Sequence, residues 1–409
     1  MYNTRVKLSD SCREMTICDT NILGCQSTNT LIGLNDEGKK LIKLLQSDTP
    51  IIFENLTDDQ RTLFQALDNH GYFSNEKPVT QLEKASLHVT SRCNLKCEGC
   101  YSYEDSRNEK QDLSLEQIKY LLDNLAEAGI VRLAISGGEP FMRDDIVEIL
   151  KYAKVDLGIK SIICVSNGIA TTTRYLEAAK YVDELSFSMD GFDNKSSTIR
   201  LNDEFDSMVD KMATLKDQGV NVSIIFTLHK NNLRAYHKLE AFADGLNIPC
   251  YFSLYAVEEF NENKSSLILD DQDYDFLFSI SGKKINDSNI QGNNLQCRSL
   301  CGMGQKVISI GSNGNIYPCT MFTGYDDYLM GNALNDKVSE IIKSKANRYS
   351  TLSVDNIEKC KDCHVKYICG GGCRFRSYTL TKNIFNADAN LCKGQIFHIE
   401  HILLQASQK

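Results

Sequence analysis

Residues 85–100 read ASLHVTSRCNLKCEGC, and this stretch decides the fold. Its first six residues, 85–90, read as an extended strand. Cys93, Cys97 and Cys100 follow at C-x3-C-x2-C spacing. Three thiolates hold three corners of a [4Fe-4S] cluster and leave the fourth iron without a protein ligand, which separates a reactive metal site from a closed structural one. The stretch therefore predicts a strand that ends at an open cluster site.

The closely spaced cysteines have two alternative interpretations, a zinc knuckle and a disulfide staple. A tetrahedral structural zinc ion needs a fourth Cys or His close by, and the sequence from Tyr101 through Leu113 has neither. The triad therefore favours an iron-sulfur cluster over zinc.

The composition of the whole chain bounds its class. It has 16 cysteines in 409 residues, but the N-terminus has no apolar signal core and no run approaches a membrane span. We therefore expect reduced thiols, a cytoplasmic location and no membrane partner. Lys plus Arg number 45 against 54 for Asp plus Glu, a formal charge of -9, and no basic stretch is long enough to follow a phosphate backbone. Nucleic acid is therefore not an expected partner.

Strand and helix patterns alternate from about residue 85 to 255, which is typical of βα units around a parallel sheet. The predicted strands are 85–90, 131–136, 161–166, 184–189, 220–228 and 248–255. Between the first two strands, Ser114 and Gln117 have capping-box spacing before an apolar helical stripe that stops at Gly129. Six such units predict an α/β fold, an open partial (β/α)6 barrel of the TIM type. In such folds the chemistry gathers at the carboxyl ends of the strands.

Polar and glycine residues follow the second, third and fourth predicted strands at this end. They are Gly137, Gly138 and Glu139, then Ser166 and Asn167, then Ser188 and Asp190, with Arg200 in the segment beyond. Alone, a Gly-Gly-Glu or a Ser-Asn-Gly is more often an ordinary turn than a ligand site. In this order after successive strands, they jointly predict a binding site.

The triad and these strand ends resemble the radical S-adenosylmethionine (radical SAM) enzymes. The resemblance implies that SAM binds the open iron and that an electron from the cluster cleaves it to a 5'-deoxyadenosyl radical, which abstracts hydrogen. It also implies that Gly137 to Glu139 receive the SAM ammonium, that Ser188 and Asp190 face the ribose and that Arg200 pairs with the carboxylate. An electron donor of low potential is implied too, such as flavodoxin or ferredoxin.

One position departs from that family. The residue before the third cluster cysteine is usually aromatic or bulky there, close to the adenine, and here it is Gly99. Tyr101 or Tyr103 is our candidate for that surface.

Eight further cysteines lie between residues 297 and 392, twice the four that a closed [4Fe-4S] site requires. Eight cysteines at four per cluster suggest two more clusters, three in all. Their spacing resembles the SPASM domain, a cluster-binding extension of radical SAM enzymes that modify peptides and proteins. The resemblance implies one cluster on Cys297, Cys301, Cys319 and Cys373, and another on Cys360, Cys363, Cys369 and Cys392. Closed clusters suit electron relay and structural support. The alternative is a pair of zinc ribbons.

Five cysteines remain outside these groups. Cys164 and Cys250 lie in apolar strands and read as small buried hydrophobes. Cys12, Cys18 and Cys25 are scattered near the N-terminus, and their spacing of six and seven residues matches no metal motif.

The first 80 residues differ in composition and predict a small α+β domain. A helix is expected at 39–45 and another at 57–67, the second capped by Thr57 with Gln60. Strands followed by helices resemble the winged-helix-like recognition domain typified by PqqD, which holds a leader peptide along a strand edge. The alternative is a subdomain that merely caps the barrel. The predicted domains are 1–80, 81–285 for the barrel and 286–409 for the SPASM segment.

These resemblances imply a maturase that abstracts hydrogen from a ribosomally made precursor peptide and closes an oxidative crosslink, a thioether or a carbon-carbon bond. One alternative is an anaerobic sulfatase maturase, which usually carries an Asp where this chain has Thr320. Another is a non-catalytic iron-sulfur electron carrier or sensor, which has no use for Gly137 to Glu139 and Arg200 together. No catalytic acid or base is predicted.

Overall fold

A computed structural model of the chain describes residues 6–47, 50–74, 82–102, 106–200, 205–256, 265–280 and 295–407. The strands are β1 (Cys12–Ile17), β2 (Thr20–Cys25), β3 (Thr30–Leu34), β4 (Lys84–His88), β5 (Arg132–Ser136), β6 (Ser161–Ser166), β7 (Glu184–Met189), β8 (Val222–Leu228), β9 (Cys250–Leu254), β10 (Val307–Ile310), β11 (Asn315–Tyr317) and β12 (Gly331–Asn332). The α-helices are α1 (Asp36–Gln46), α2 (Asp58–Asn69), α3 (Leu115–Glu127), α4 (Ile146–Lys151), α5 (Thr172–Ala179), α6 (Phe205–Asp217), α7 (Tyr236–Gly245), α8 (Asp271–Ile280), α9 (Val338–Ser350), α10 (Lys366–Cys369), α11 (Arg374–Thr381) and α12 (Ala389–Ser407).

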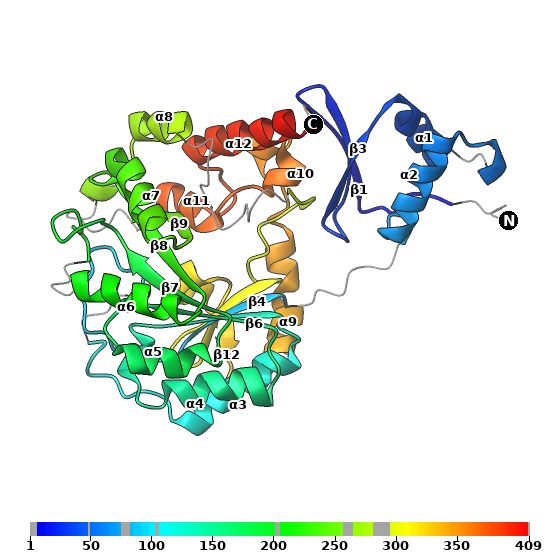
Figure 1. Cartoon of the computed structure of the whole chain (residues 1–409). Coiled ribbons are helices and arrows are strands. Elements are labelled where there is room, and N and C mark those ends of the chain that lie inside the picture. The colour runs from blue at the N-terminus through cyan, green and yellow to red at the C-terminus, as the bar shows by residue number, and fades with distance from the viewer. Residues whose placement is uncertain are drawn as a thin grey trace.

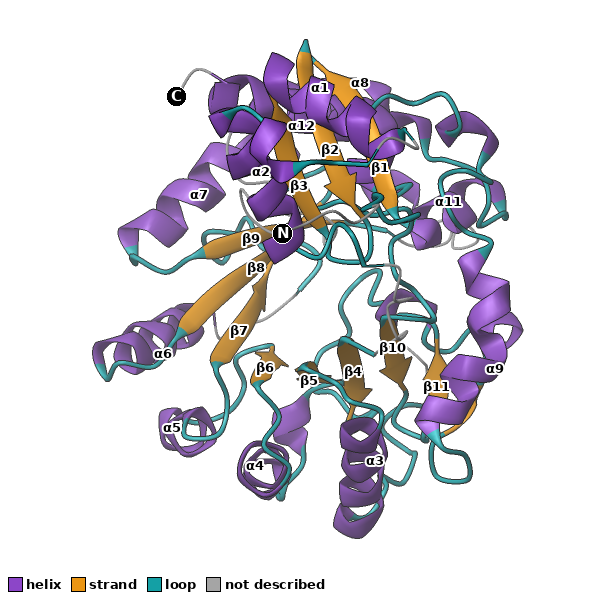
Figure 2. Ribbon diagram, turned by 90° about the vertical axis from the view of Figure 1, so that its right-hand side faces the viewer, coloured by secondary structure: helices purple, strands orange, loops and turns teal. Residues whose placement is uncertain are grey.

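Six parallel strands form the centre of the molecule, in the order β4-β5-β6-β7-β8-β9. Figure 2 shows them fanned as an open barrel with α3 to α7 on the outer side. This confirms the predicted fold, and β6 and β7 have the predicted bounds. The capping box of Ser114 and Gln117 also forms at the start of α3.

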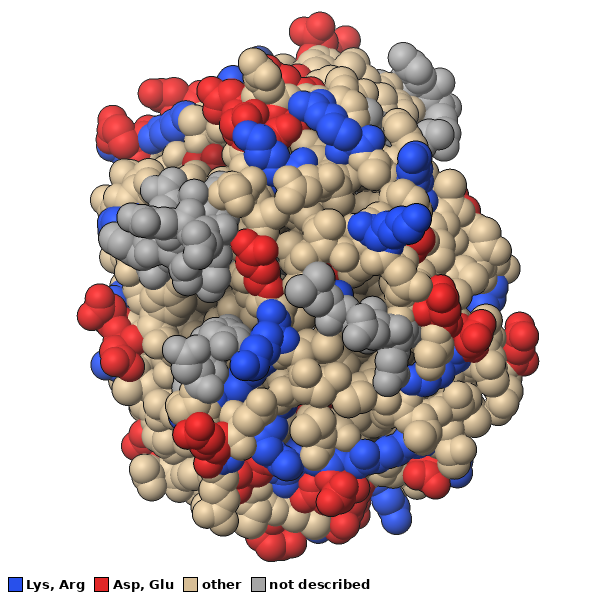
Figure 3. Space-filling view, turned by 90° about the vertical axis from the view of Figure 1, so that its left-hand side faces the viewer, with Lys and Arg blue, Asp and Glu red and all other residues tan. Residues whose placement is uncertain are grey.

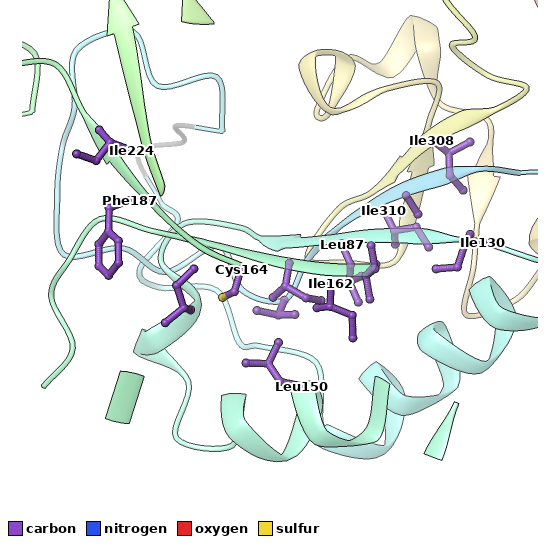
Figure 4. Packing of buried hydrophobic residues seen from close by; sticks show 14 of the residues in the cluster. Leu87, Ile130, Leu150, Ile162, Cys164, Phe187, Ile224, Ile308 and Ile310 are labelled. Carbon is purple, nitrogen blue, oxygen red and sulfur yellow. The ribbon is translucent and has the colours of Figure 1, made fainter. Parts of the chain in front are cut away.

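The main core lies between this sheet and the outer helices. Leu87 of β4, Ile162 of β6 and Phe187 of β7 belong to this core, and Leu150 of α4 lies on its helix side near Ile162 (Figure 4). Cys164 lies among them and is fully buried, so it serves as the small apolar side chain that the sequence predicts. Alternate residues of the same strands face the other way, toward the interior of the barrel.

The SPASM segment extends the barrel sheet instead of standing apart from it. Strand β10 runs parallel to β4, and β11 and β12 add to it in antiparallel fashion. The side chain of Asn124 in α3 donates to the carbonyls of Ala333 and Asp336 and accepts from the N–H of Val338. The predicted boundary at residue 285 lies outside the described residues and stays a prediction.

The N-terminal part is a three-stranded antiparallel sheet, β1-β2-β3, with α1 and α2 on one face. Thr57 and Gln60 form the predicted capping box at α2. The opposite face packs on the SPASM segment beside α10 and α12 (Figure 1). We call this contact the N–C interface, and its buried residues are Met15, Ile17, Ile22, Cys297, Val365, Ile368 and Ile399.

Two surface features bear on possible partners. None of the helices in the described ranges is long and apolar enough to cross a bilayer. On the face drawn in Figure 3, acidic and basic side chains are interspersed, without a continuous basic stripe.

Candidate functional site

The cysteine triad lies in the loop after β4, at the mouth of the barrel. The N–H of Cys93 donates to the Asn108 side chain at 2.9 Å, and the N–H of Leu95 lies 3.4 Å from the Cys93 sulfur. Burial raises the pKa of Cys97, Arg200 lowers it, and the thiols of Cys100 and Cys93 raise it again. The three predicted ligands therefore lie within electrostatic reach of one another and of Arg200.

Gly137 and Gly138 join the end of β5 to this loop. The N–H of Gly138 donates to the Thr90 carbonyl at 2.8 Å, and the N–H of Glu139 donates to the Arg92 carbonyl at 2.8 Å. A Cβ atom on Gly138 would lie 2.2 Å from the Arg92 carbonyl oxygen, so only glycine allows this approach. The close contact places backbone atoms of both loops beside Cys93, which we call the glycine rim. Such an arrangement suits a ligand that is bound by main-chain atoms.

The Glu139 side chain is held by hydrogen bonds within the protein, and its contact with SAM stays a prediction. The side chain is 1% exposed, and its oxygens accept from Phe141 N–H, Ser166 Oγ and Asn167 N–H at 3.1, 2.8 and 2.7 Å. Burial raises the pKa of Glu139 to about 7, against these hydrogen bonds, which lower it. In this structure the carboxylate ties the ends of β5 and β6 together instead of facing an open space, because the main chain supplies donors on both sides.

Asn167 connects the third strand end to the triad. Its Nδ2 donates to Asn94 Oδ1 at 2.8 Å and lies 3.7 Å from the Cys93 sulfur. Ser166 is buried beneath it and bonds to Glu139 and to the Tyr175 hydroxyl. The structure thus brings both predicted residues to the barrel mouth, Asn167 at the triad and Ser166 one layer below.

The Asp190 side chain is also held by hydrogen bonds within the protein. Its oxygens accept from Ser197 Oγ and from the N–H groups of Thr198 and Ile199, each at 2.8 Å, and the side chain is fully buried. Burial raises its pKa, but hydrogen bonds led by that from His229 outweigh burial and leave the pKa below its ordinary value. In this structure Asp190 positions the segment that carries Arg200, and its contact with a ribose stays a prediction.

Arg200 itself has free binding capacity. Its Nε is buried and has no hydrogen-bond partner among the described residues. The preceding residue is anchored to the cluster loop, because the N–H of Glu98 donates to the Ile199 carbonyl at 3.0 Å. A buried guanidinium nitrogen without an acceptor fits a bound carboxylate. Ser188, on β7, is half-buried and stays a predicted contact.

The space beside Gly99 is filled by a residue that the sequence did not single out. A Cβ atom on Gly99 would lie 1.9 Å from the hydroxyl oxygen of Tyr255, which follows β9. Tyr255 is 4% exposed, and its hydroxyl has no hydrogen-bond partner in the described ranges. Tyr101 instead packs on His88 of β4, with ring centroids 5.8 Å apart, and Tyr103 lies outside the described residues. The missing side chain of Gly99 leaves room for the Tyr255 ring, and only the fold brings these two distant residues together.

These residues fit the cofactors that the triad suggests. In the described ranges no three cysteine, histidine or carboxylate side chains lie close enough to enclose one metal ion. The choice between zinc and an iron-sulfur cluster therefore rests on the spacing of the cysteines, which favours the cluster. The triad spacing, the glycine rim and the unpaired nitrogen of Arg200 together suit a cluster with a small zwitterion beside it.

The cysteines of the second late group influence one another electrostatically. Burial raises the pKa of Cys369 to about 11, and the thiols of Cys392 and Cys363 raise it as well. Burial also raises the pKa of Cys392 to about 11, with further increases from Cys360 and Cys363. The four predicted ligands therefore lie within electrostatic reach of one another, and their shared cluster stays a prediction.

The first late group is divided. Cys301, Cys319 and Cys373 pack along the edge of the main core, and burial followed by Cys301 raises the pKa of Cys319 to about 12. Cys297 is fully buried in the N–C interface, where burial and then Cys25 raise its pKa to about 12. A Cβ atom on Gly24 would lie 2.5 Å from the Cys297 sulfur. The structure thus places the Cys297 sulfur against β2, and its part in the first late cluster stays a prediction from the sequence.

Comparison with known families agrees with this site. Residues 87–243 match the radical SAM superfamily, and residues 301–364 match SPASM, an iron-sulfur cluster-binding domain. The chain carries a radical SAM domain followed by a SPASM domain. These two domains indicate iron-sulfur clusters and S-adenosylmethionine as cofactors.

Similar sequences carry several names. Fe-coproporphyrin III synthase of Methanosarcina barkeri is 30% identical over 171 residues, and the match covers 41% of this chain and 42% of that protein. Mycofactocin maturase MftC of Mycolicibacterium smegmatis is 26% identical over 312 residues, covering 70% of this chain and 76% of that protein. AdoMet-dependent heme synthase of Methanosarcina barkeri is 24% identical over 327 residues, covering 72% and 91%.

Two solved structures share the fold. AnSMEcpe with bound AdoMet and Cp18Cys peptide has a TM-score of 0.62 at 19% identity, covering 80% of this chain and 99% of that chain. Streptococcus suis SuiB bound to precursor peptide SuiA has a TM-score of 0.57 at 17% identity, covering 94% and 99%.

Proposed function

We propose that this enzyme is a peptide maturase, which abstracts hydrogen from a ribosomally made precursor peptide and closes an oxidative thioether or carbon-carbon crosslink. The observation that carries the proposal is the docked N-terminal sheet. Helices α1 and α2 pack on one face of this sheet, and the SPASM segment packs on the other. Strand β3 is an edge strand, because it pairs only with β2 among the described strands. An edge strand fixed in this way is suited to hold an extended peptide by main-chain hydrogen bonds.

The comparisons support this substrate class. Mycofactocin maturase is named for peptide maturation, and SuiB was solved with its precursor peptide. The SuiB likeness covers 94% of this chain, against 80% for anSMEcpe. The order of three strands followed by α1 and α2 agrees with a PqqD-like leader-binding domain, which remains part of the proposal.

The cofactor arrangement in the proposal is three [4Fe-4S] clusters. Cys93, Cys97 and Cys100 would hold the one at which SAM binds, and SAM supplies the 5'-deoxyadenosyl radical when it is bound there. The second late group would hold a closed cluster that accepts the electron released on ring closure. Cys301, Cys319 and Cys373 of the first group would hold the third cluster without Cys297, and the electron donor would be a flavodoxin or ferredoxin.

The protein's own residues would orient SAM at the barrel mouth. Main-chain carbonyls beside Gly137 and Gly138 receive the ammonium group, and Arg200 pairs with the carboxylate. Replacement of Arg200 by Ala should cost on the order of 1.5–3 kcal/mol of SAM affinity, about tenfold or more.

A porphyrin substrate is the second candidate, because two of the similar sequences are named as Fe-coproporphyrin III and heme synthases. The sulfatase-maturase alternative gains nothing from the site. Thr320 stands where that family's Asp is expected, and its hydroxyl donates to Ser86 Oγ on β4 at 2.6 Å. The Thr320 hydroxyl is therefore already hydrogen-bonded, and it cannot serve as the base that a carboxylate provides in that family.

The test is mass spectrometry of three substrates treated with reduced enzyme and SAM. These are the short peptides encoded beside the gene, coproporphyrin, and a sulfatase-derived peptide with Cys or Ser. We expect a precursor peptide lighter by two hydrogens. Decarboxylated porphyrin, or formylglycine with every precursor unchanged, would contradict the proposal.

A further inference from the structure

Cys12 and Cys25 face each other across the first two strands. They are direct partners in the antiparallel register of β1 and β2. The neighbouring pair, Ser11 and Gln26, carries the ladder hydrogen bond, with Gln26 N–H donating to the Ser11 carbonyl at 3.1 Å. Cys12 and Cys25 therefore form a non-hydrogen-bonded pair, the kind in which opposite Cα atoms approach most closely, at about 4.5 Å.

The two thiols also lie close together. Both lie on the face of the sheet that packs on α1 and α2, close enough for each thiol to shift the pKa of the other. A disulfide needs Cα atoms about 4.4–6.8 Å apart and Cβ vectors that converge, and a narrow cross-strand pair meets both conditions. The backbone therefore needs no rearrangement to join the two sulfurs.

Hydroxyl groups and a carbonyl surround the pair. The Cys25 sulfur lies 3.0 Å from Ser27 Oγ and 3.4 Å from Ser11 Oγ, and these two hydroxyls are 2.9 Å apart. The Cys12 thiol donates to the Tyr72 carbonyl at 3.6 Å. Polar groups hold both sulfurs in place, as an apolar core would not.

Access to the pair is one-sided. Cys25 is fully buried, whereas Cys12 is partly exposed. An external reagent therefore meets Cys12 first, and Cys25 stands behind it as the second thiol. The other cysteines outside the late groups and the triad differ, since Cys164 and Cys250 are buried in separate strands and Cys18 lies in the β1–β2 turn.

We propose that Cys12 and Cys25 are a redox site that a low-molecular-weight disulfide, such as oxidised glutathione, converts to a cross-strand disulfide. The Cys12 sulfur attacks one sulfur of the reagent and releases one small thiol. The Cys25 sulfur then attacks the mixed disulfide on Cys12 and releases the second. Two protein thiols lose two protons and two electrons, and one small disulfide becomes two small thiols.

The bond has a defined structural effect. It closes a loop over the β1–β2 turn and fixes the register of the two strands, which otherwise depends on hydrogen bonds and packing. Because β2 carries β3, the bond stiffens the whole N-terminal sheet. This inference stands whether or not that sheet binds a peptide.

The experiment uses the full-length enzyme with its clusters, equilibrated anaerobically at a series of glutathione ratios. Acid quenching, alkylation of free thiols and trypsin digestion follow. Trypsin cleaves after Arg13, so Cys12 lies in residues 8–13 and Cys25 in residues 14–39, together with Cys18. We expect the two peptides to become linked, with a mass two hydrogens below their sum, and Cys12 and Cys25 to lose alkylation at the same glutathione ratio.

Variants separate the possible sources of the link. Cys18→Ser should keep it, whereas Cys12→Ser and Cys25→Ser should each lose it. Hydrogen exchange of the unmodified enzyme supplies a second measurement, and amides of β1 and β2 should exchange more slowly after oxidation. A link between Cys25 and Cys297, a mixed disulfide that persists on Cys12, or full alkylation of both thiols in fully oxidised glutathione would overturn the proposal.

Discussion

The barrel mouth and the N–C interface both gather cysteines, but they bring them from different distances along the chain. At the mouth, the predicted residues directly follow neighbouring parallel strands, so the order of the sheet places them side by side. At the N–C interface, Cys297 meets Gly24 of β2, a partner near the other end of the chain. Motifs at strand ends are thus readable from sequence, whereas a contact between distant segments depends on how the domains dock.

The two late cysteine groups repeat this contrast. Three cysteines of the second group belong to one short stretch around α10, and they lie within electrostatic reach of Cys392; they are Cys360, Cys363 and Cys369. The first group spans the sheet extension and the N–C interface, and one member, Cys297, packs with the N-terminal sheet. Short spacing makes a common site a local event, and long spacing leaves it to tertiary packing.

The largest expected difference between the regions is in iron and activity. The triple variant Cys93→Ala, Cys97→Ala and Cys100→Ala should lose four of twelve irons, one cluster of three, and all SAM cleavage. Cys297→Ala should keep its iron, because its sulfur faces Gly24. Iron analysis and 5'-deoxyadenosine release measure both. Loss of iron in Cys297→Ala would mean that this thiol turns to the first group when the cluster forms.

The buried carboxyl at the barrel mouth should produce a pH dependence. Because burial raises the pKa of Glu139 from 4.5 to about 7, the folded chain binds this proton more tightly than the unfolded chain. The resulting stability is fully present below pH 4.5 and is lost as the pH rises through about 7, in all about 3 kcal/mol. Urea unfolding of Glu139→Gln between pH 5 and 8 should lack this slope.

The exposed Glu177 of α5 offers a matched control for that measurement. Glu177→Gln should retain the slope of the unmodified protein. An unchanged slope in Glu139→Gln would assign the pH dependence to another group.

The N–C interface can be tested through two glycines of adjacent strands. A Cβ atom on Gly24 would meet the Cys297 sulfur at 2.5 Å and Met15 at 2.9 Å, whereas one on Gly33 would have no atom within 4 Å. Gly24→Val should therefore lower the free energy of unfolding by about 2 kcal/mol and speed hydrogen exchange in β1 and α10. Gly33→Val should leave both unchanged. Equal effects of the two substitutions would remove the interface as their cause.

The smallest effect concerns the Tyr255 hydroxyl at the barrel mouth. It is buried without a hydrogen-bond partner in the described part of the chain, so Tyr255→Phe should raise the free energy of unfolding without SAM by about 1 kcal/mol. Tyr251→Phe on β9, where the side chain is 37% exposed, should change nothing. Chemical unfolding measures both variants. A loss of stability in Tyr255→Phe would show that the hydroxyl has a partner, such as a bound water.

The success of the strand predictions has a simple physical cause. Strands 161–166 and 184–189 were predicted with the bounds of β6 and β7, because apolar runs bounded by turn residues report burial on both faces of a parallel sheet. The capping boxes at Ser114 and Thr57 were predictable because each depends on residues three positions apart. Which buried donors surround Asp190 and Glu139 is not visible in the sequence, because those donors come from other segments of the fold.

What the sequence determined by itself is local: the triad, the glycine pair beside it, the strand order and the compact second cysteine group all follow from spacing along the chain. Only the tertiary structure decided that Tyr255 fills the space beside Gly99, that Cys297 packs on Gly24, and that Cys12 and Cys25 share one face of a strand pair. Each of these depends on which side chain lies across from a given residue. The packing of distant segments decides which side chain that is, and the hydrophobic periodicity of the sequence does not predict it.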